Sequence, residues 1–319
     1  MHSEFELITR FFTPDPPGSE AGVALGVGDD CTLLAPTPGQ RLAVSVDTSV
    51  AGSHFPEDAP AMAIGHRALA VSLSDLAAMG ARARWCLMSL TLPAADDDAW
   101  LADFARGFHA LCAATGTALV GGDVTRGTLS IGVTVMGEVP PEQALTRSGA
   151  RPGDLLAVTG ALGGGAGGLA LWRRGERALE HPLLRRYLHP LPRLEAGLAL
   201  RGLASAAIDI SDGLLADLGH LLEASGVGAE LTPAALPLAE GLVAALGKEP
   251  AREAGLHGGD DYELLLGFPP EHLGEARARL AALDLPLTVI GRFSAEPGIR
   301  GVAITGARGW QHFTGDAAP

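Results

Sequence analysis

Cysteine is scarce in this chain of 319 residues, and features of extracellular or membrane proteins are missing. Cys31, Cys86 and Cys112 are odd in number and far apart, so they indicate neither a disulfide framework nor a zinc knuckle. No apolar run approaches the roughly 20 residues of a membrane span. The first residues lack the basic start and apolar core of a signal peptide. We therefore expect a cytoplasmic protein with reduced, structural cysteines.

Basic residues are also few compared with acidic ones. The chain has 23 Lys and Arg against 37 Asp and Glu, which gives a formal net charge of −14. Nucleic acids and anionic membranes select basic surfaces, so we expect neither as a partner. An anionic nucleotide would have to be received through metal ions.

The common nucleotide-binding motifs are absent or incomplete. The chain has no P-loop, since Lys248 is followed by Glu249 rather than Ser or Thr. The segment Gly163-x-Gly165-x-x-Gly168 matches the bare dinucleotide fingerprint. The acidic residue that should end a second strand about 20 residues further on is missing, however. A phosphate-proximal loop or a helix-packing loop is the better interpretation.

The chain length suggests two domains, and alternating or helical spacing of apolar residues predicts their elements. Leu42, Val44 and Val46 alternate in a pattern typical of a half-buried strand, which we expect to end in Asp47. In the first half we further expect helices over about 60–79 and after Asp96, and strands over 85–92, 117–120 and 128–139, the last two in a hairpin-like region.

The polar, proline-bearing segment 140–153 is typical of a linker, which divides the chain into domains over 1–140 and 150–319. In the second half we expect strands over 154–158, 206–210, 262–268 and 287–293. Helices are expected from Leu169, from Asp212 and over about 270–283. The predicted fold class is α+β, with mixed sheets covered by helices, rather than a doubly wound parallel sheet.

Aspartates at turns are the most informative feature present. Two carboxylates 4 Å apart repel by roughly 4 kcal/mol at an effective dielectric of 20, so several gathered together require a cation. Mg²⁺ fits, because it binds carboxylates together with substrate phosphates. A single Asp at such a turn is more often structural, and Asp212 is equally explained as a helix N-cap, so the hypothesis depends on their number. The segments are Gly28-Asp29-Asp30, Val46-Asp47-Thr48, Ser74-Asp75, Gly122-Asp123, Asp209-Ile210-Ser211-Asp212-Gly213 and Gly259-Asp260-Asp261.

Three other side chains have two interpretations each. His54 is either a solvated loop residue or a hydrogen-bond donor to phosphate. Arg147 is either a surface charge or a phosphate clamp. Trp310 either anchors the C-terminal tail or stacks on a heteroaromatic ligand.

Taken in order, these motifs closely resemble the thiamine-monophosphate kinase family over nearly the whole chain. The family belongs to the superfamily of aminoimidazole ribonucleotide synthetase. The resemblance implies an N-terminal domain that binds metal and ATP and forms a homodimer, and a C-terminal domain that completes the nucleotide and substrate site. It also implies ATP-dependent, Mg²⁺-dependent phosphorylation of thiamine monophosphate. The motifs that carry it are Gly26-Val-Gly-Asp-Asp30, Val46-Asp47-Thr48 with His54, Ser72-Leu-Ser-Asp75, Gly121-Gly-Asp123, Leu145-Thr-Arg147-Ser-Gly149, Ile208-Asp-Ile-Ser-Asp-Gly213 and Gly258-Gly-Asp-Asp-Tyr-Glu-Leu264.

The resemblance also implies roles for individual residues. ATP would be held by Gly122, Asp123, Arg147 and Ser211, and the thiamine moiety and its phosphate by His54, Asp260 and Trp310. The chain departs from the family at Val46, where Thr is common, and at Asp260, where Glu is common. Several Mg²⁺ ions would be bound by Asp30, Ser45, Val46 through its carbonyl, Asp47, Asp75, Asp123, Asp209 and Asp212.

Two alternatives remain at this point. One is another ATP-dependent enzyme of the superfamily, such as a selenophosphate synthetase, although the reactive cysteine that such an enzyme needs near its N-terminus is missing from residues 1–25. The other is a noncatalytic nucleotide-binding module, because a fold alone does not fix function. The presence of every expected aspartate favours an enzyme.

Overall fold

The computed structural model describes residues 3–13, 22–94, 97–302 and 309. Two compact units make up the chain, one of Met1–Leu76 and Ala81–Ala144, the other of Ala77–Gly80 and Leu145–Pro319. Each unit contains a mixed sheet covered by helices, which confirms the predicted α+β class. Within the described part of the chain, no helix combines the length and the apolar character that a membrane span needs.

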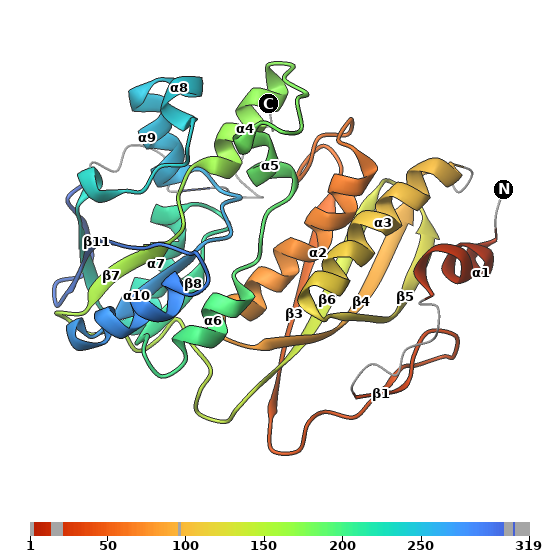
Figure 1. The fold of residues 1–319 in the computed structure, drawn as a ribbon, viewed down its shortest axis with the longest axis horizontal. Coiled ribbons are helices and arrows are strands. Elements are labelled where there is room, and N and C mark those ends of the chain that lie inside the picture. The colour runs from red at the N-terminus through yellow and green to blue at the C-terminus, as the bar shows by residue number, and fades with distance from the viewer. Residues whose placement is uncertain (1–2, 14–21, 95–96, 303–308, 310–319) are drawn as a thin grey trace. The chain divides into compact units, whose positions relative to one another are not determined.

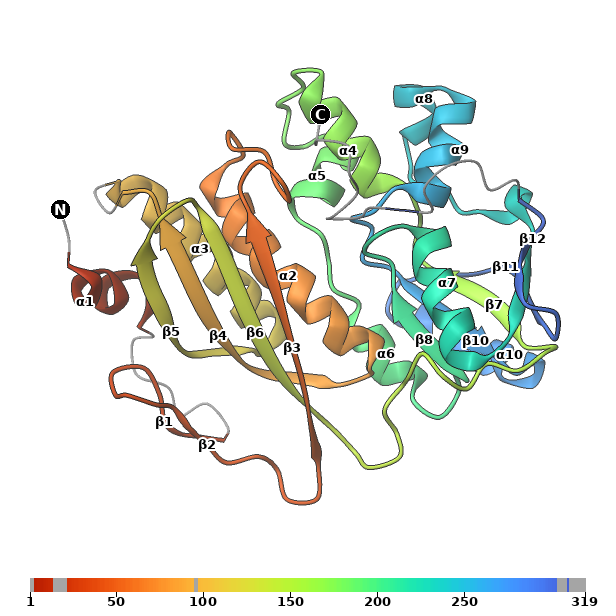
Figure 2. The same cartoon turned by 180° about the vertical axis from the view of Figure 1, so that it is seen from behind.

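The first unit is a four-stranded sheet with two long helices on one face (Figures 1 and 2). The strand order is β3-β6-β4-β5, in which β4 and β5 are parallel and the other pairs antiparallel. Helices α2 and α3 cover one face, and Figure 2 shows the other face of the sheet. The elements are α1 (Glu4–Leu7), η1 (Ile8–Phe12), β1 (Val23–Leu25), β2 (Leu33–Leu34), β3 (Arg41–Val50), α2 (Ala61–Ala78), β4 (Arg82–Leu92), α3 (Asp98–Thr115), β5 (Ala118–Arg126) and β6 (Ser130–Val139).

Helix α2 follows the sequence pattern closely. Leu69, Leu73 and Leu76 recur at helical spacing and are fully buried. The helix ends before Gly80, which has a left-handed φ of 60°, and the N–H of Ala81 donates to the carbonyl of Leu76 across the turn at 2.8 Å. The predicted helix over about 60–79 is confirmed.

Strand β3 differs from the prediction in two ways. It continues past Asp47 to Val50, because all ten residues pair with β6. Its alternation is present, but the apolar side chains Leu42, Val44 and Val46 lie on the exposed face, with 48%, 61% and 63% of their surface accessible. The face toward the helices carries Ser45 and Asp47 instead.

The prediction of a hairpin-like region over 117–139 was wrong. Strand β5 pairs in parallel with β4, and β6 inserts between β3 and β4, so β5 and β6 are not neighbours. The short strand expected over 117–120 also continues to Arg126, which places Gly122 and Asp123 within the sheet. The N-cap of α3 is Asp97, whose side chain accepts from the N–H of Trp100 at 2.9 Å; the predicted cap, Asp96, lies outside the described residues.

The second unit is built on a six-stranded sheet of order β12-β9-β11-β7-β10-β8, antiparallel except for the β12–β9 pair. Helix α7 lies on one face, and α6 and α10 on the other (Figures 1 and 2). The elements are β7 (Leu155–Thr159), α4 (Gly164–Arg173), α5 (Pro182–Leu188), α6 (Leu194–Leu200), β8 (Ala206–Asp209), α7 (Leu214–Ser225), β9 (Gly228–Leu231), η2 (Pro233–Ala235), α8 (Leu242–Leu246), α9 (Lys248–His257), β10 (Leu264–Phe268), η3 (Pro270–His272), α10 (Leu273–Ala281), β11 (Leu287–Ser294) and β12 (Gly298–Arg300).

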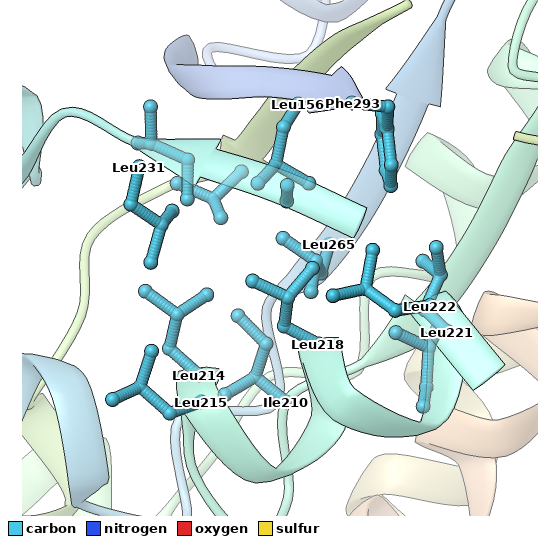
Figure 3. Close-up of a cluster of buried hydrophobic side chains, with 14 of the residues drawn as sticks. Leu156, Ile210, Leu214, Leu215, Leu218, Leu221, Leu222, Leu231, Leu265 and Phe293 are labelled. Atoms are coloured by element: carbon cyan, nitrogen blue, oxygen red, sulfur yellow. The ribbon is translucent and has the colours of Figure 1, made fainter. Parts of the chain in front are cut away.

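The core of this unit lies between α7 and the sheet. Figure 3 shows Leu214, Leu218 and Leu222 of α7 facing Leu265 and Phe293 of the strands, all of them buried. Burial of such side chains contributes roughly 1.5–3 kcal/mol each. This packing fixes the N-terminal end of α7 beside the C-terminal end of β8, where the aspartates lie.

Two helix starts in the second unit were predicted wrongly. Helix α4 begins at Gly164 rather than Leu169, because the glycine-rich segment itself is helical and buried. Helix α7 begins at Leu214 with Gly213 as its N-cap, so Asp212 precedes the N-cap position.

Candidate functional site

Ser45, Asp47 and Asp75 form a cluster on the helix-covered face of the first sheet. Alternation along β3 points Ser45 and Asp47 to the same side, and Asp75 comes from the last turns of α2. The Ser45 hydroxyl donates to Oδ2 of Asp75 at 2.5 Å. Two of the predicted carboxylates are therefore brought together from segments about 30 residues apart.

The electrostatics of this cluster favour a cation. The pKa of Asp47 is raised to about 6, mainly by burial and also by the charge of Asp75, while a hydrogen bond from Ser72 opposes the rise. Oδ2 of Asp47 is buried without a hydrogen-bond partner. A desolvated carboxylate next to a second one is unfavourable unless a cation coordinates it, and hard oxygen donors fit Mg²⁺.

A cavity of about 810 Å³ lies elsewhere in the first unit. Asp30, Gly122 and Asp123 line it on the polar side, and Phe12 and Met88 are among its apolar lining residues. Gly122 is required by close approach, since a Cβ atom there would lie 1.9 Å from the carbonyl oxygen of Met88. A cavity with an apolar wall and a few carboxylates is suited to a nucleotide that carries metal-bound phosphates.

The second unit gathers Asp209, Ser211 and Asp212 at the end of β8. Asp209 is buried, and Ser211 and Asp212 are half-buried. The turn that carries them is organised by Asp217 in the first turn of α7: Oδ2 of Asp217 accepts from the N–H groups of Ser211, Asp212 and Gly213, each at 3.1 Å. The pKa of Asp217 is raised to about 7, mainly by burial and also by the charges of Asp209 and Asp212, while the N–H groups of Gly213 and Asp212 oppose the rise.

The loop after α9 lies directly against this turn. Asp260 donates its N–H to the carbonyl of Ser211 at 2.9 Å, and Tyr262 donates its N–H to the carbonyl of Ile210 at 2.8 Å. The hydroxyl of Tyr262 donates to Oδ1 of Asp260 at 3.0 Å. The predicted substrate residue Asp260 and the predicted metal and ATP residues of the 209–212 turn therefore share one hydrogen-bonded substructure.

The remaining predicted residues are His54, Arg147 and Trp310. Nδ1 of His54 accepts from the N–H of Val50 at 3.0 Å, which leaves Nε2 as the donor of the neutral ring. The Arg147 side chain is exposed, and its carbonyl accepts from Ser225 at 2.8 Å. Trp310 lies outside the described residues. Its neighbour Gly309 lies against the 209–212 turn, since a Cβ there would come within 2.5 Å of the carbonyl oxygen of Asp212.

Across the described residues, no group of three or more His, Cys, Asp or Glu side chains is arranged to hold a metal ion. In the first unit, Asp47 and Asp75 lie together with the Ser45 hydroxyl. A Mg²⁺ ion bound there would take its other ligands from water or substrate phosphate, which is its usual mode of binding in proteins.

Comparisons with known proteins cover almost the whole chain. Residues 28–139 match the model of the AIR synthase related protein, N-terminal domain, and residues 151–304 match the corresponding C-terminal domain. The thiamine-monophosphate kinase of Salmonella typhimurium is 44% identical over 297 residues, which cover 92% of this chain and 91% of that protein.

The chain belongs to the thiamine-monophosphate kinase family.

Solved structures of the family agree with this assignment. The crystal structure of the thiamine-monophosphate kinase from Stenotrophomonas maltophilia has a TM-score of 0.87 and 44% identity, covering 93% of this chain and 96% of that one. A structure described as AaThiL complexed with AMPPCP and TMP has a TM-score of 0.79 and 29% identity, covering 98% of this chain and 99% of that one. The two-domain kinase fold expected from the motifs is confirmed.

Two buried aspartates of this kinase fold were missed by the sequence reasoning. Asp217 had a weak signal, because an acidic residue in the first turn of a helix is favoured by the helix dipole. Asp261 was visible only as the second member of Asp260-Asp261, and in the structure it turns away from Asp260 into the protein, where Gly163 and Gly165 donate to it.

Proposed function

We propose that this chain is a kinase that transfers the γ-phosphoryl group of ATP to thiamine monophosphate, giving thiamine diphosphate and ADP, with Mg²⁺. The observation that carries the proposal is the match over 92% of the chain to a thiamine-monophosphate kinase, together with the presence of each expected aspartate. The buried carboxylate of Asp47 beside Asp75 supports the metal dependence.

The residue roles follow the family motifs. In the first unit, Gly122 and Asp123 hold ATP, and His54 holds the thiamine moiety or its phosphate. In the second unit, Arg147 and Ser211 hold ATP, while Asp260 and Trp310 hold the substrate. The Mg²⁺ ligands are Asp30, Ser45, the carbonyl of Val46, Asp47, Asp75, Asp123, Asp209 and Asp212.

The chemistry needs no covalent enzyme intermediate. An oxygen of thiamine monophosphate attacks the γ-phosphorus in line, the bond from that phosphorus to the β,γ-bridging oxygen breaks, and ADP leaves. The second pKa of a phosphate monoester is near 6, so the nucleophile is already ionised at neutral pH and needs no strong base. Bound Mg²⁺ would neutralise the charge of the two approaching phosphates. The carboxylates of the chain set where those cations bind, and Asp260 orients the cationic thiamine.

The test is to incubate the purified protein with ATP, Mg²⁺ and thiamine monophosphate and to identify the products. We expect thiamine diphosphate and ADP in equal amounts, and no thiamine diphosphate when EDTA is added. If only ADP and free phosphate form, with thiamine monophosphate untouched, the proposal is refuted. Nucleotide binding without any product would favour a noncatalytic module.

We further propose that the chain forms a homodimer in the cytoplasm through the open face of the first sheet. Leu42, Val44 and Val46 of β3 are exposed there, on the face that α2 and α3 do not cover (Figure 2). A second copy of the chain presents the same apolar stripe, so the contact is self-complementary under two-fold symmetry.

A further inference from the structure

The loop that carries Asp260 has an unusual backbone. Asp260 has a φ of 69° and Tyr262 a φ of 51°, both in the left-handed region that residues other than glycine rarely adopt. Such conformations persist only where the surrounding structure holds them, and they are frequent at functional sites. The contacts that hold this loop therefore determine where the carboxylate of Asp260 points.

Asp261, between these two residues, is the loop's connection to helix α4. Only 8% of its surface is accessible. Oδ2 accepts from the N–H of Gly163 at 2.6 Å, and Oδ1 accepts from the N–H of Gly165 at 3.1 Å. One carboxylate thus satisfies two backbone donors at the start of α4, which otherwise has no side-chain cap at its N-terminus.

The glycine-rich segment is also in direct contact with Asp260. A Cβ atom on Gly165 would lie 2.4 Å from the carbonyl oxygen of Asp260 and 2.6 Å from its carbonyl carbon. Only glycine therefore allows α4 and the Asp260 backbone to approach this closely. The two contacts act together, because the hydrogen bonds of Asp261 pull the loop onto the surface that Gly165 leaves open.

The C-terminal end of the loop is anchored separately. Glu263 is fully buried and accepts from Nε and Nη2 of Arg193 at 2.8 and 2.5 Å and from the hydroxyl of Thr159 at 2.8 Å. Arg186 lies 3.6 Å from the same carboxylate and donates to the carbonyl of Ala161 at 3.0 Å. A charge-assisted network of this kind fixes the end of the loop but makes no contact that selects the conformation of Asp260.

We propose that Asp261 is a positioning residue for the substrate: its carboxylate clamps the Asp260 loop onto the glycine-rich start of α4 and so fixes the direction of the Asp260 carboxylate toward thiamine monophosphate. This inference rests on the proposed function and extends it to a residue that does not touch the substrate. It also explains the Gly163-x-Gly165-x-x-Gly168 motif. The amides of Gly163 and Gly165 are occupied by a carboxylate of the chain itself, so the motif serves loop packing and is no dinucleotide site.

The test compares Asp261→Asn with Asp154→Asn. Asp154 is also a buried aspartate of the second unit, and it accepts from the N–H of Arg151 at 3.0 Å and the hydroxyl of Ser205 at 2.6 Å. In Asp261→Asn the two glycine N–H donors reach different oxygens, so the new amide NH₂ faces one of them and leaves it unpaired. In Asp154→Asn both donors reach Oδ2, so the amide oxygen accepts from both and the variant loses only the charge of the acceptor.

Only Asp261→Asn is expected to raise KM for thiamine monophosphate, by about tenfold or more, with KM for ATP within about twofold of wild type. Calorimetric titration of each protein with thiamine monophosphate provides a readout independent of turnover. Asp154→Asn should bind it as wild type does.

A second pair of variants addresses the same loop without touching Asp261. Gly165→Ala places a methyl group against the Asp260 backbone, whereas in Gly167→Ala the methyl group meets the side chain of Leu242 at 2.5 Å. Both add one methyl group to α4. We expect Gly165→Ala to weaken thiamine monophosphate binding selectively and Gly167→Ala to leave it unchanged. This pair decides the matter if Asp261→Asn does not fold.

These experiments distinguish failure of the proposed kinase function from failure of the positioning role of Asp261. Wild-type protein that forms no thiamine diphosphate refutes the proposed function. Active wild-type protein, with KM for thiamine monophosphate unchanged in both Asp261→Asn and Gly165→Ala, refutes the positioning role. An equal rise in KM for both substrates also refutes it, because a general loss of structure would produce that result.

Discussion

At the residue level, Asp47 is a buried carboxylate whose environment favours binding of a cation. Its Oδ2 atom is buried without a hydrogen-bond partner, and Asp75 faces it from α2. Both features raise the cost of the ionised form, and burial contributes more than the neighbouring charge. A residue that destabilises the protein without its ligand is typical of a binding site.

We therefore expect Asp47→Asn and Asp75→Asn to abolish turnover while leaving the fold intact, and to raise the melting temperature in EDTA. Each substitution removes a metal ligand and relieves the repulsion between the two carboxylates. Melting temperature in EDTA and kcat at saturating Mg²⁺ measure the two effects. Asp103→Asn, on the exposed surface of α3 beside Arg106, is the control and should change neither. Near-normal activity of both site variants at saturating Mg²⁺ would contradict the assignment.

Asp217 is the second residue that we expect to affect activity. Its carboxylate accepts from three consecutive backbone N–H groups of the turn that carries Ser211 and Asp212. In Asp217→Asn the amide keeps one acceptor oxygen but loses its charge, and hydrogen bonds to charged groups are worth about 1.5–3 kcal/mol. We expect kcat to fall by about tenfold or more and the Mg²⁺ concentration for half-maximal activity to rise. A Mg²⁺ titration of activity checks this. A variant with wild-type Mg²⁺ dependence would limit Asp217 to a structural role.

At the level of elements, one face of β3 carries candidate metal ligands and the other carries exposed apolar side chains. Ser45 and Asp47 face the helices, and Leu42 and Val44 face outward from the sheet. Because side chains alternate along a strand, residues adjacent in sequence serve the candidate metal site and the proposed dimer contact. The two functions are thereby linked through one strand.

The proposed dimer contact predicts the effect of Leu42→Glu combined with Val44→Glu. A charged pair in an apolar interface is left without partners, so the double variant should run as a monomer of 32.6 kDa and the wild type at twice that mass. Analytical ultracentrifugation measures both. Val243→Glu, a similarly exposed valine on α8, is the control and should remain dimeric. A monomeric wild type, or a double variant that stays dimeric, would overturn the proposal.

At the level of the whole molecule, buried carboxylates control how stability depends on pH. The pKa values of Asp47, Asp217 and Asp261 are raised to about 6, 7 and 7 from an ordinary 3.8, in each case mainly by burial. For Asp261, Glu263 adds to the rise, while the N–H groups of Gly163 and Gly165 and the charge of Arg186 oppose it. The folded state therefore binds more protons than the unfolded state between about pH 4 and pH 7.

The free energy of unfolding in EDTA should therefore be highest at low pH within this window and should fall as pH rises through about 6 to 7. Each pKa unit between the folded and unfolded states corresponds to about 1.4 kcal/mol. Chemical denaturation in EDTA at about pH 5 and about pH 8 measures the difference. Asp261→Asn should show a smaller difference than wild type, since one titrating group is gone. An equal or larger difference would show that Asp261 is ionised in the folded protein at both pH values.

The sequence alone determined the local features of this protein. Helical spacing of leucines predicted α2, and the Gly80 stop predicted its end, because both depend on residues within a few turns of each other. The order and spacing of the aspartate motifs were enough to identify the family, since each motif is a short contiguous segment. The fold class and the kinase reaction follow from that identification.

Only the tertiary structure decided which side of an element is used and which distant groups meet. Alternation in β3 gave two faces, but the position of α2 and α3 determined that the face with Ser45 and Asp47 is covered and the valines are exposed. The insertion of β6 beside β4 overruled the local appearance of a hairpin. Asp261 accepts from the amides of Gly163 and Gly165, almost a hundred residues away in the sequence. No local pattern predicts such a contact, because an aspartate at a turn has the same sequence signal whether its carboxylate faces solvent, metal or backbone.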